Sequence, residues 1–317
     1  MKPVMINLFR GLPALALFVS CAAAWAMPLG SSARTAIPSN IQQIISVDYR
    51  MLKNSDTAMA LKQQLLPDNL KQFEAALKGI GITPDQDLDQ LVFAAYRTPK
   101  QGVKVVGVAQ GSFSATAVLK KMRVQKIHPA KYLDNDLYAM SGGMQMTFLD
   151  ENTLLFGELT AVRGSLDTRN GDTSAVDSNG SISDMMSSVD SGMVWSVLDQ
   201  DGTQNMLRSA LGDAAKLADY ETVKKRVLGS SYIMNFTDGI KFDLSVITSD
   251  SITATTLSTL LKAGILYRKM TASPVEKTAM QDVTVDSDSS SLQMHFKSDD
   301  KEFQSLMHSP LFAAVSH

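Results

Sequence analysis

The feature that most limits how this chain folds is a pair of apolar runs between Asp87 and Phe113. The first run reads DLDQLVFAAYR, the second reads VKVVGVAQGSF, and the turn-forming segment TPKQG joins them. Nearly continuous apolar runs, rich in Val, Phe and Tyr, are typical of central β-strands that are covered on both faces. The stretch is therefore predicted to be a hairpin at the centre of a sheet.

A second hairpin is predicted in the other half of the chain, where Tyr232–Phe236 and Ile240–Ile247 are joined through Asp238-Gly239. Asp-Gly is a dipeptide that suits a two-residue hairpin turn. Each hairpin follows a strand and a helical region and precedes a helix, two more strands and a helix. The order β, α, β, β, α, β, β, α thus occurs twice, and its first six elements have the ferredoxin-like order. We therefore predict an α+β fold made of two ferredoxin-like β-α-β-β-α-β(-β-α) repeats, with a mostly antiparallel sheet and helices packed on one face.

The segment between the two predicted repeats reads DTRNGDTSAVDSNGS and holds two Asn-Gly pairs and almost no sizeable apolar residue. Such a composition is typical of a linker or a long surface loop. The predicted organisation is a signal peptide over 1–26, a flexible lead-in over 27–40, a first repeat over 41–167, a linker or surface loop over 168–181, a second repeat over 182–310 and a C-terminal tail over 311–317.

The first residues have the pattern of a secretory leader. Lys2 and Arg10 precede the apolar run Gly11–Ala23, and Ala24-Trp25-Ala26 has the small-x-small pattern that precedes cleavage, here before Met27. The apolar run is shorter than the roughly 20 residues that span a bilayer, although an uncleaved anchor is the alternative. The leader predicts an exported, periplasmic or extracellular protein.

The only cysteine, Cys21, lies inside this leader, so membrane attachment is expected through the leader alone or through a lipid on Cys21. The preceding Leu17-Phe18-Val19-Ser20 has some likeness to a lipoprotein box, with Phe18 where Leu is usual. Cleavage after Ala26 leaves a chain without cysteine, which excludes disulfides, thiol catalysis and thiolate metal sites.

The charge balance argues against nucleic acid as a partner. The formal net charge is −2, and loss of the leader with Lys2 and Arg10 makes it −4. An acidic protein of this kind offers no positive field for phosphates.

For each candidate motif for catalysis or for metal or cofactor binding, a structural role explains the residues better. His128, His295, His308 and His317 lack the short spacings of zinc ligands. Asp199-Gln200-Asp201-Gly202 resembles part of a calcium loop but lacks its terminal acid, and a turn before a helix cap at Thr203 explains it better. Met140, Met144 and Met146 suit a strand in a core better than a copper site. The chain has no Gly-x-Ser-x-Gly elbow and no phosphate loop around Gly107 and Gly111. We therefore assign no catalytic, cofactor-binding or metal residues.

One resemblance bears on the source of the chain. Pro38, Gln42, Ile44, Val47, Asp48, Arg50 and Leu52, followed by Asp87, Asp89, Leu91 and Val92, fit the patterns P-x-x-x-Q-x-I-x-x-V-D-x-R-x-L and D-x-D-x-L-V. In these residues the chain resembles an uncharacterised family of exported bacterial proteins of acidobacterial type. The resemblance implies export and a bacterial source, and it supplies no catalytic residues.

The function expected from the sequence is a non-catalytic module that binds a protein or a small apolar ligand, through its strand faces or through a groove between the repeats. Two alternatives stay open: a carrier of hydrophobic ligands or lipids, and a hydrolase whose site is assembled from distant residues. A carrier requires a large dry cavity, an enzyme requires converging titratable side chains in a pocket, and a binding module requires an exposed apolar surface.

Overall fold

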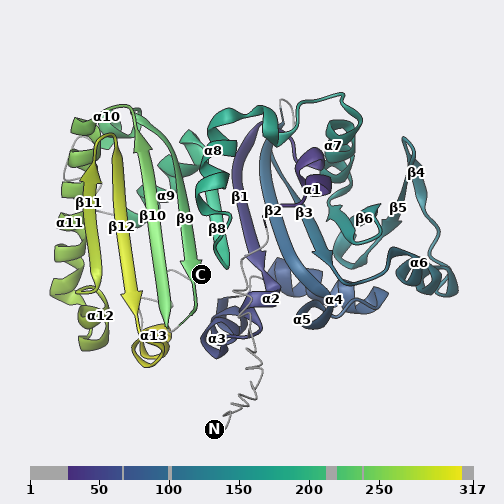
Figure 1. The fold of residues 1–317 in the computed structure, drawn as a ribbon, viewed down its shortest axis with the longest axis horizontal. Helices are drawn as coiled ribbons and strands as arrows, with labels where there is room; N and C mark the ends of the chain where they lie inside the picture. The colour runs from purple at the N-terminus through teal and green to yellow at the C-terminus, as the bar shows by residue number, and fades with distance from the viewer. Residues whose placement is uncertain (1–27, 66–67, 99–101, 212–219, 238, 309–317) are drawn as a thin grey trace, which may run out of the picture.

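The structure, a computed structural model, describes residues 28–65, 68–98, 102–211, 220–237 and 239–308. The leader with Cys21 and the tail over 311–317 lie outside the described residues. All strands join one antiparallel sheet (Figure 1) in the order β11-β12-β10-β9-β8-β1-β2-β3-β7-β6-β5-β4. The prediction of an α+β protein with a mostly antiparallel sheet is confirmed.

The strands of the first half of the chain are β1 (Ile41–Asp48), β2 (Leu88–Thr98), β3 (Gly102–Gly111), β4 (Ala130–Tyr132), β5 (Asn135–Ala139), β6 (Gln145–Asp150) and β7 (Thr153–Gly157). Those of the second half are β8 (Val194–Leu198), β9 (Val227–Asn235), β10 (Ile240–Thr248), β11 (Val283–Asp288) and β12 (Ser291–Ser298). Both predicted hairpins are confirmed, because β2 pairs with β3 and β9 pairs with β10.

The helices of the first half are α1 (Ser31–Ala36), α2 (Tyr49–Leu52), α3 (Asp56–Leu65), α4 (Asp68–Ile80), α5 (Pro84–Asp87), α6 (Ala115–Val124) and α7 (Leu159–Asn170), with the 3₁₀ turn η1 (Ser141–Gly143). The turn η2 (Val176–Ser178) and helix α8 (Gly180–Val189) connect the halves. The second half adds α9 (Gln200–Leu211), α10 (Tyr220–Lys224), α11 (Ser251–Thr271), α12 (Pro274–Ala279) and α13 (Asp300–Met307).

The two halves meet where β1 pairs with β8, with Ile45 opposite Ser196. Counted outward from this junction, the strands run β1, β2, β3, β7, β6 on one side and β8, β9, β10, β12, β11 on the other. Each side therefore starts with a single strand, continues with a hairpin, and adds a second hairpin whose later strand lies nearer the centre.

The predicted ferredoxin-like arrangement is wrong in its strand neighbours. In a split β-α-β unit, another strand separates the two strands that the helix connects. Here β1 pairs directly with β2, and β8 pairs directly with β9, both antiparallel. The elements follow the ferredoxin-like order along the chain. The helices between β1 and β2, however, lead the chain back so that β2 lies directly beside β1.

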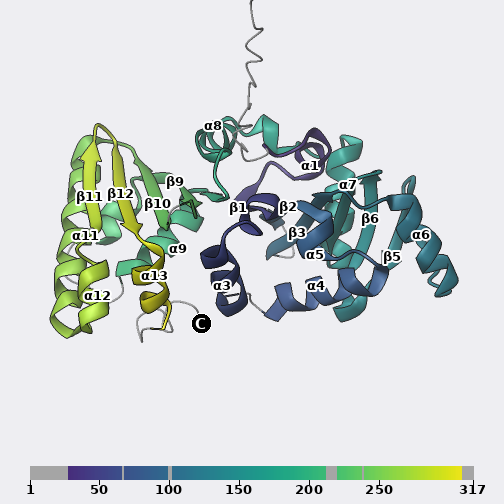
Figure 2. The same ribbon diagram turned by 60° about the horizontal axis from the view of Figure 1, so that its bottom comes forward.

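The prediction that helices pack on one face holds for the outer strands of the second half and is wrong for the first half. In the first half α1 and α7 cover one face, whereas α4 and α6 cover the other (Figure 2). Alternate residues of β2 accordingly enter two different cores, with Val92 and Ala94 in one and Leu91 in the other. The continuous apolar runs of this hairpin are explained by burial on both sides.

The expected flexible lead-in is instead a packed segment. Helix α1 buries Ala33 and Ala36, and Ile37 follows it into the same core. The expected linker over 168–181 is also ordered locally: Ala175 forms a bridge with Pro38, and Val176 is fully buried. Small polar residues dominate both segments. A few small or β-branched apolar residues in each are buried in the core and hold the segment against the rest of the protein.

Tyr96 provides a test of this packing at alkaline pH. Its hydroxyl donates to the Ala161 carbonyl at 3.0 Å, and burial, followed by the charge of Asp167, raises the pKa of Tyr96 to about 12. A raised pKa stabilises the fold below pH 10, and this contribution is lost as the pH rises toward 12. We expect Tyr96→Phe to lower the free energy of unfolding by about 1 kcal/mol at pH 7. Urea titrations from pH 7 to 11 should show the difference shrinking above pH 10; a constant difference contradicts the assignment.

Candidate functional site

Among the described residues, no helix covers one face of the sheet in the outer part of the second half. Leu244, Val246 and Leu292 point to the other face, where they pack with α9, α10 and α11. Alternation along a strand places their neighbours on the opposite face. There Asp243 and His295 remain about half exposed. Among the described elements only α8 lies against this face, beside β8 and β9.

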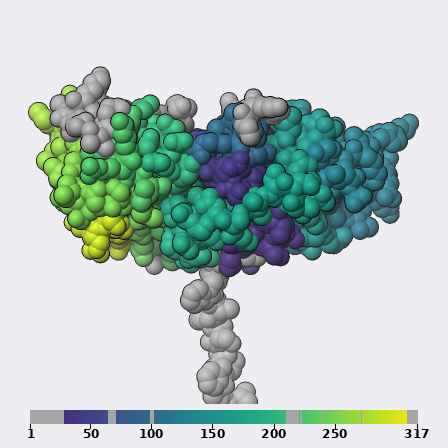
Figure 3. All heavy atoms as spheres, turned by 90° about the horizontal axis from the view of Figure 1, so that it is seen from above, coloured from purple at the N-terminus to yellow at the C-terminus, as the bar shows by residue number. Residues whose placement is uncertain are grey.

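A groove of about 570 Å³ runs between α8 and this uncovered face. Figure 3 shows the teal atoms of α8 beside the green atoms of the second half. The floor of the groove consists of three strands whose registers align the side chains in rows. These rows are Ile233–Asp243–His295, Ser231–Ser245–Gln293 and Gly229–Ile247–Ser291.

Helix α8 forms the wall of the groove because one of its faces is buried in the core and an adjacent face is turned to the sheet. Ser181, Asp184, Met185, Ser188 and Val189 line the groove at helical spacing. Asn179 caps the helix, accepting from the Ile182 amide at 3.3 Å.

Gly229 sets how closely the wall approaches the floor. A Cβ atom at this position would lie 3.1 Å from the Met185 methyl carbon and 3.0 Å from the Leu198 carbonyl oxygen. The glycine thus lets the Met185 side chain rest on β9, where it lines the groove.

The polar groups of the floor are partly engaged with one another. The Gln293 amide nitrogen donates to Ser245 Oγ at 3.0 Å and to Ser291 Oγ at 3.2 Å. The His295 Nδ1 lies 2.6 Å from an Asp243 carboxylate oxygen. The lining contains the carboxylates of Asp184 and Asp243 and no Lys or Arg.

This arrangement suits binding more than chemistry. Met185, Val189 and Ile247 offer apolar contact, while the serine hydroxyls and the two carboxylates accept hydrogen bonds from a neutral or cationic ligand. An Asp–His pair held through Nδ1 is the arrangement that orients a catalytic base. In the described part of the chain, however, no hydroxyl hydrogen-bonds to the other ring nitrogen of His295.

The sequence of β10 carries a signal for this face. In β10, Phe242, Leu244 and Val246 alternate with Lys241, Asp243 and Ser245. Strict alternation is typical of a strand with one solvated face, in contrast to the continuous runs of β2 and β3.

A second cavity, of about 470 Å³, lies on the other side of the sheet between the two halves. Asn54, Ser55 and Asp56 line it from the first half, and Phe236 and Asp300 from the second. This cavity lies where a groove between the repeats is expected. Among the described residues that line it, no side chains form aligned rows like those of the first groove.

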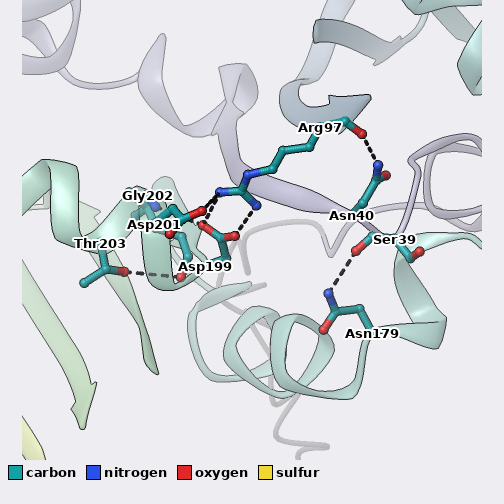
Figure 4. A network of polar contacts seen from close by, with 9 residues as sticks. Ser39, Asn40, Arg97, Asn179, Asp199, Asp201, Gly202 and Thr203 are labelled. Atoms are coloured by element: carbon teal, nitrogen blue, oxygen red, sulfur yellow. Dashed lines mark hydrogen bonds and ion pairs between the residues drawn. The ribbon is translucent and has the colours of Figure 1, made fainter. Parts of the chain in front are cut away.

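The segment that resembles a calcium loop belongs to a polar network at the junction of the halves (Figure 4). Arg97 pairs with Asp199 and reaches Asp201 at 3.0 Å, and its hydrogen bond to Asp199 raises the pKa of the guanidinium. Asp199 also accepts from the Gly202 amide at 2.9 Å, so Asp199 caps α9 in place of the expected Thr203. Both carboxylates are thus engaged by an arginine of the same chain.

The other singled-out residues have structural roles. A Cβ on Gly107 would lie 2.0 Å from the Phe156 ring, and one on Gly111 would lie 1.9 Å from the Asp87 carbonyl oxygen. These glycines therefore permit close packing. Met146 lies on β6, whereas Met140 and Met144 flank the η1 turn between β5 and β6. Met140 and Met146 are buried in the core beside α4 and α6, and Met144 packs against it partly buried. His308 Nδ1 lies 2.7 Å from the Gln304 carbonyl oxygen.

A cluster around Lys62 was not found from the sequence. Lys62 Nζ lies 2.7 Å from Glu74, contacts Asp85, and lies 4.7 Å from the centre of the Tyr49 ring. The Tyr49 hydroxyl donates to Glu74 at 3.0 Å, and burial raises its pKa. Every charge here has a partner, so the cluster is a structural tie between α2, α3, α4 and α5.

In the ranges that the structure describes, there is no group of three or more His, Cys, Asp or Glu side chains that could hold a metal ion. No helix within those ranges is long and apolar enough to cross a bilayer.

Solved structures similar to this chain include a distant neighbour. Crystal form I of TP0453 is similar, with 9% sequence identity and a TM-score of 0.49, over 90% of this chain and 97% of that one. The sequence matches no protein-family model and no curated protein.

Proposed function

We propose that this protein is an exported, non-catalytic binding module whose ligand lies in the groove between α8 and the uncovered sheet face. The observation that carries the proposal is the difference between the halves: helices cover both faces of the first half, whereas β10, β11 and β12 keep one face free of helices among the described elements. The leader over 1–26 supports export to the periplasm or the exterior. The first five strands on each side of the β1–β8 junction follow the same order, which supports an internal repeat; β5 and β4 extend the first half beyond it.

The groove favours a ligand with an apolar part and hydrogen-bond donors, such as a segment of a partner protein or a small molecule. Its volume lies within the usual range of ligand pockets, roughly 300–1,000 Å³. Asp184 and Asp243 favour a neutral or positively charged ligand and oppose nucleic acid. A carrier of lipids or other hydrophobic ligands has less support, because Ser231, Ser245 and Gln293 make the floor polar.

A hydrolase is the second candidate, and only the Asp243–His295 pair favours it. If His295 acted as a base, His295→Ala would abolish turnover in a screen of ester and peptide substrates. Binding of a retained ligand in the groove would continue in that variant.

Native mass spectrometry of the mature protein purified from its own host tests the proposed site. We expect a bound mass on the wild type that is absent from Ser245→Trp, because the indole fills the centre of the groove floor. Ser305→Trp, an exposed position on α13, is the matched control and should retain the bound mass. Equal occupancy of both variants contradicts the site, and a lipid as the bound mass favours the carrier.

A further inference from the structure

Helix α11 presents a surface that is separate from the groove. Its inner side buries Leu257, Leu260 and Leu261 against the face of β10, β11 and β12 that is opposite the groove. The helix forms the outer edge of the second half (Figures 1 and 2), so its other side faces away from the sheet.

The outer side of α11 carries an uncharged stripe. Its members follow a 4-3-4-3-4 spacing and are Ile252, Thr256, Thr259, Ala263, Leu266 and Met270. The large residues at its ends are unusually accessible: Ile252 is 75% exposed, Leu266 is 64% exposed and Met270 is 78% exposed. This is the spacing with which one helix packs along another.

The polar atoms of the stripe are already satisfied. Thr256 Oγ1 donates to the Ile252 carbonyl at 2.8 Å, and Thr259 Oγ1 donates to the Thr255 carbonyl at 3.0 Å. A partner can therefore cover both threonines without leaving a buried hydroxyl unpaired.

The shape of the stripe favours a helix over a membrane surface. Thr256, Thr259 and Ala263 are small and occupy its middle, so a second helix can approach closely between the larger ends. A helix that lies in a membrane interface needs large apolar side chains along its whole length.

The charges beside the stripe determine which helix it suits. Lys262 and Lys269 lie seven residues apart along one border, Arg268 is near, and the helix contains no Asp or Glu. A second copy in antiparallel orientation would place these lysines against each other, which is unfavourable. Acidic side chains on the partner helix would pair with them.

We propose that the outer stripe of α11 docks an amphipathic helix of a partner protein that has apolar residues at the same spacing and acidic residues beside them. This contact goes beyond the proposed groove function, since it uses the opposite side of the sheet.

Fluorescence anisotropy with two synthetic helical peptides tests the proposal. Both peptides carry Leu at the 4-3 spacing; one has Glu at the flanking positions and its twin has Lys. We expect the Glu peptide to bind at least about tenfold more tightly than its twin. The variant with Leu266→Lys and Met270→Lys should lose this binding. Val124→Lys on α6, 77% exposed, is the matched control and should retain it.

Three outcomes would overturn the proposal. One is that the protein binds the Glu and Lys peptides with equal affinity, or that the Leu266/Met270 double variant binds the Glu peptide as tightly as the wild type does. Another is binding to phosphatidylglycerol vesicles with no binding to the Glu peptide, which indicates a membrane surface. The third is a dimer in sedimentation that the double variant abolishes, which indicates a second copy. Ser245→Trp should leave peptide binding unchanged, so failure here is distinguishable from failure of the groove.

Discussion

Trp195→Ala is expected to lower the free energy of unfolding by about 3–5 kcal/mol, because it removes the largest fully buried side chain of the described protein. Trp195 is 1% exposed and lies on β8, opposite Ser46 of β1 and Ile233 of β9. Its core cluster includes α1 and α7 of the first half and α8 of the connection. The loss should therefore appear in both halves of the sheet.

Circular dichroism during urea denaturation measures this loss. The two halves should still unfold in one transition, because the β1–β8 junction and this core join them. Trp195→Phe keeps most of the ring contacts and should lose less than the alanine variant. Two separated transitions in the wild type would contradict a shared core, and an equal loss in the two variants would contradict the packing assigned to the indole.

Lys62→Met is expected to lower the free energy of unfolding by about 3 kcal/mol, because it leaves the largely buried Glu74 carboxylate without its cation. The Lys62 side chain is 12% exposed and that of Glu74 is 13% exposed, so solvent screens this pair weakly. Methionine keeps the length and the apolar contacts of the lysine stem, and the change therefore isolates the charge.

The double variant Lys62→Met with Glu74→Gln separates the charge from the packing. Removing both charges should restore about half or more of the lost free energy, since the desolvation cost of a lone carboxylate disappears. Trp195 fluorescence follows unfolding in the Lys62 and Glu74 variants, because the other tryptophan, Trp25, lies in the predicted leader. Glu74→Gln alone completes the cycle. A loss in the double variant equal to the sum of the losses in Lys62→Met and Glu74→Gln would show that the two residues are not coupled.

Local patterns predict the strands and most helices because their causes are local. The Asp-Gly pair before Ile240, of which Asp238 lies outside the described residues, predicts the hairpin of β9 and β10, and the apolar spacing around Leu257 and Leu261 predicts α11. Proline interrupts helices, so Pro67 predicts a break; Pro67 itself lies outside the described residues, and α3 ends at Leu65 while α4 starts at Asp68. Residue type and spacing suffice for these elements.

The sheet order and the site depend on contacts between distant residues. No local pattern states that β1 pairs with β8, or that β1 lies directly beside β2 despite four intervening helices. The groove requires Met185 of α8 to rest on Gly229, an approach set by packing of the connection. The alternation in β10 predicts one solvated face, but it cannot place α8 beside that face.

The most direct test of the groove is photo-crosslinking in the host, with a benzophenone amino acid at Ser245 on its floor. The same group at Ser305, exposed on α13, serves as the matched position. The account predicts a distinct crosslinked product from Ser245 that is absent from Ser305 and is competed by excess unlabelled mature protein. Identical products from both positions, or none from Ser245, would contradict a ligand site between α8 and the uncovered face of the sheet.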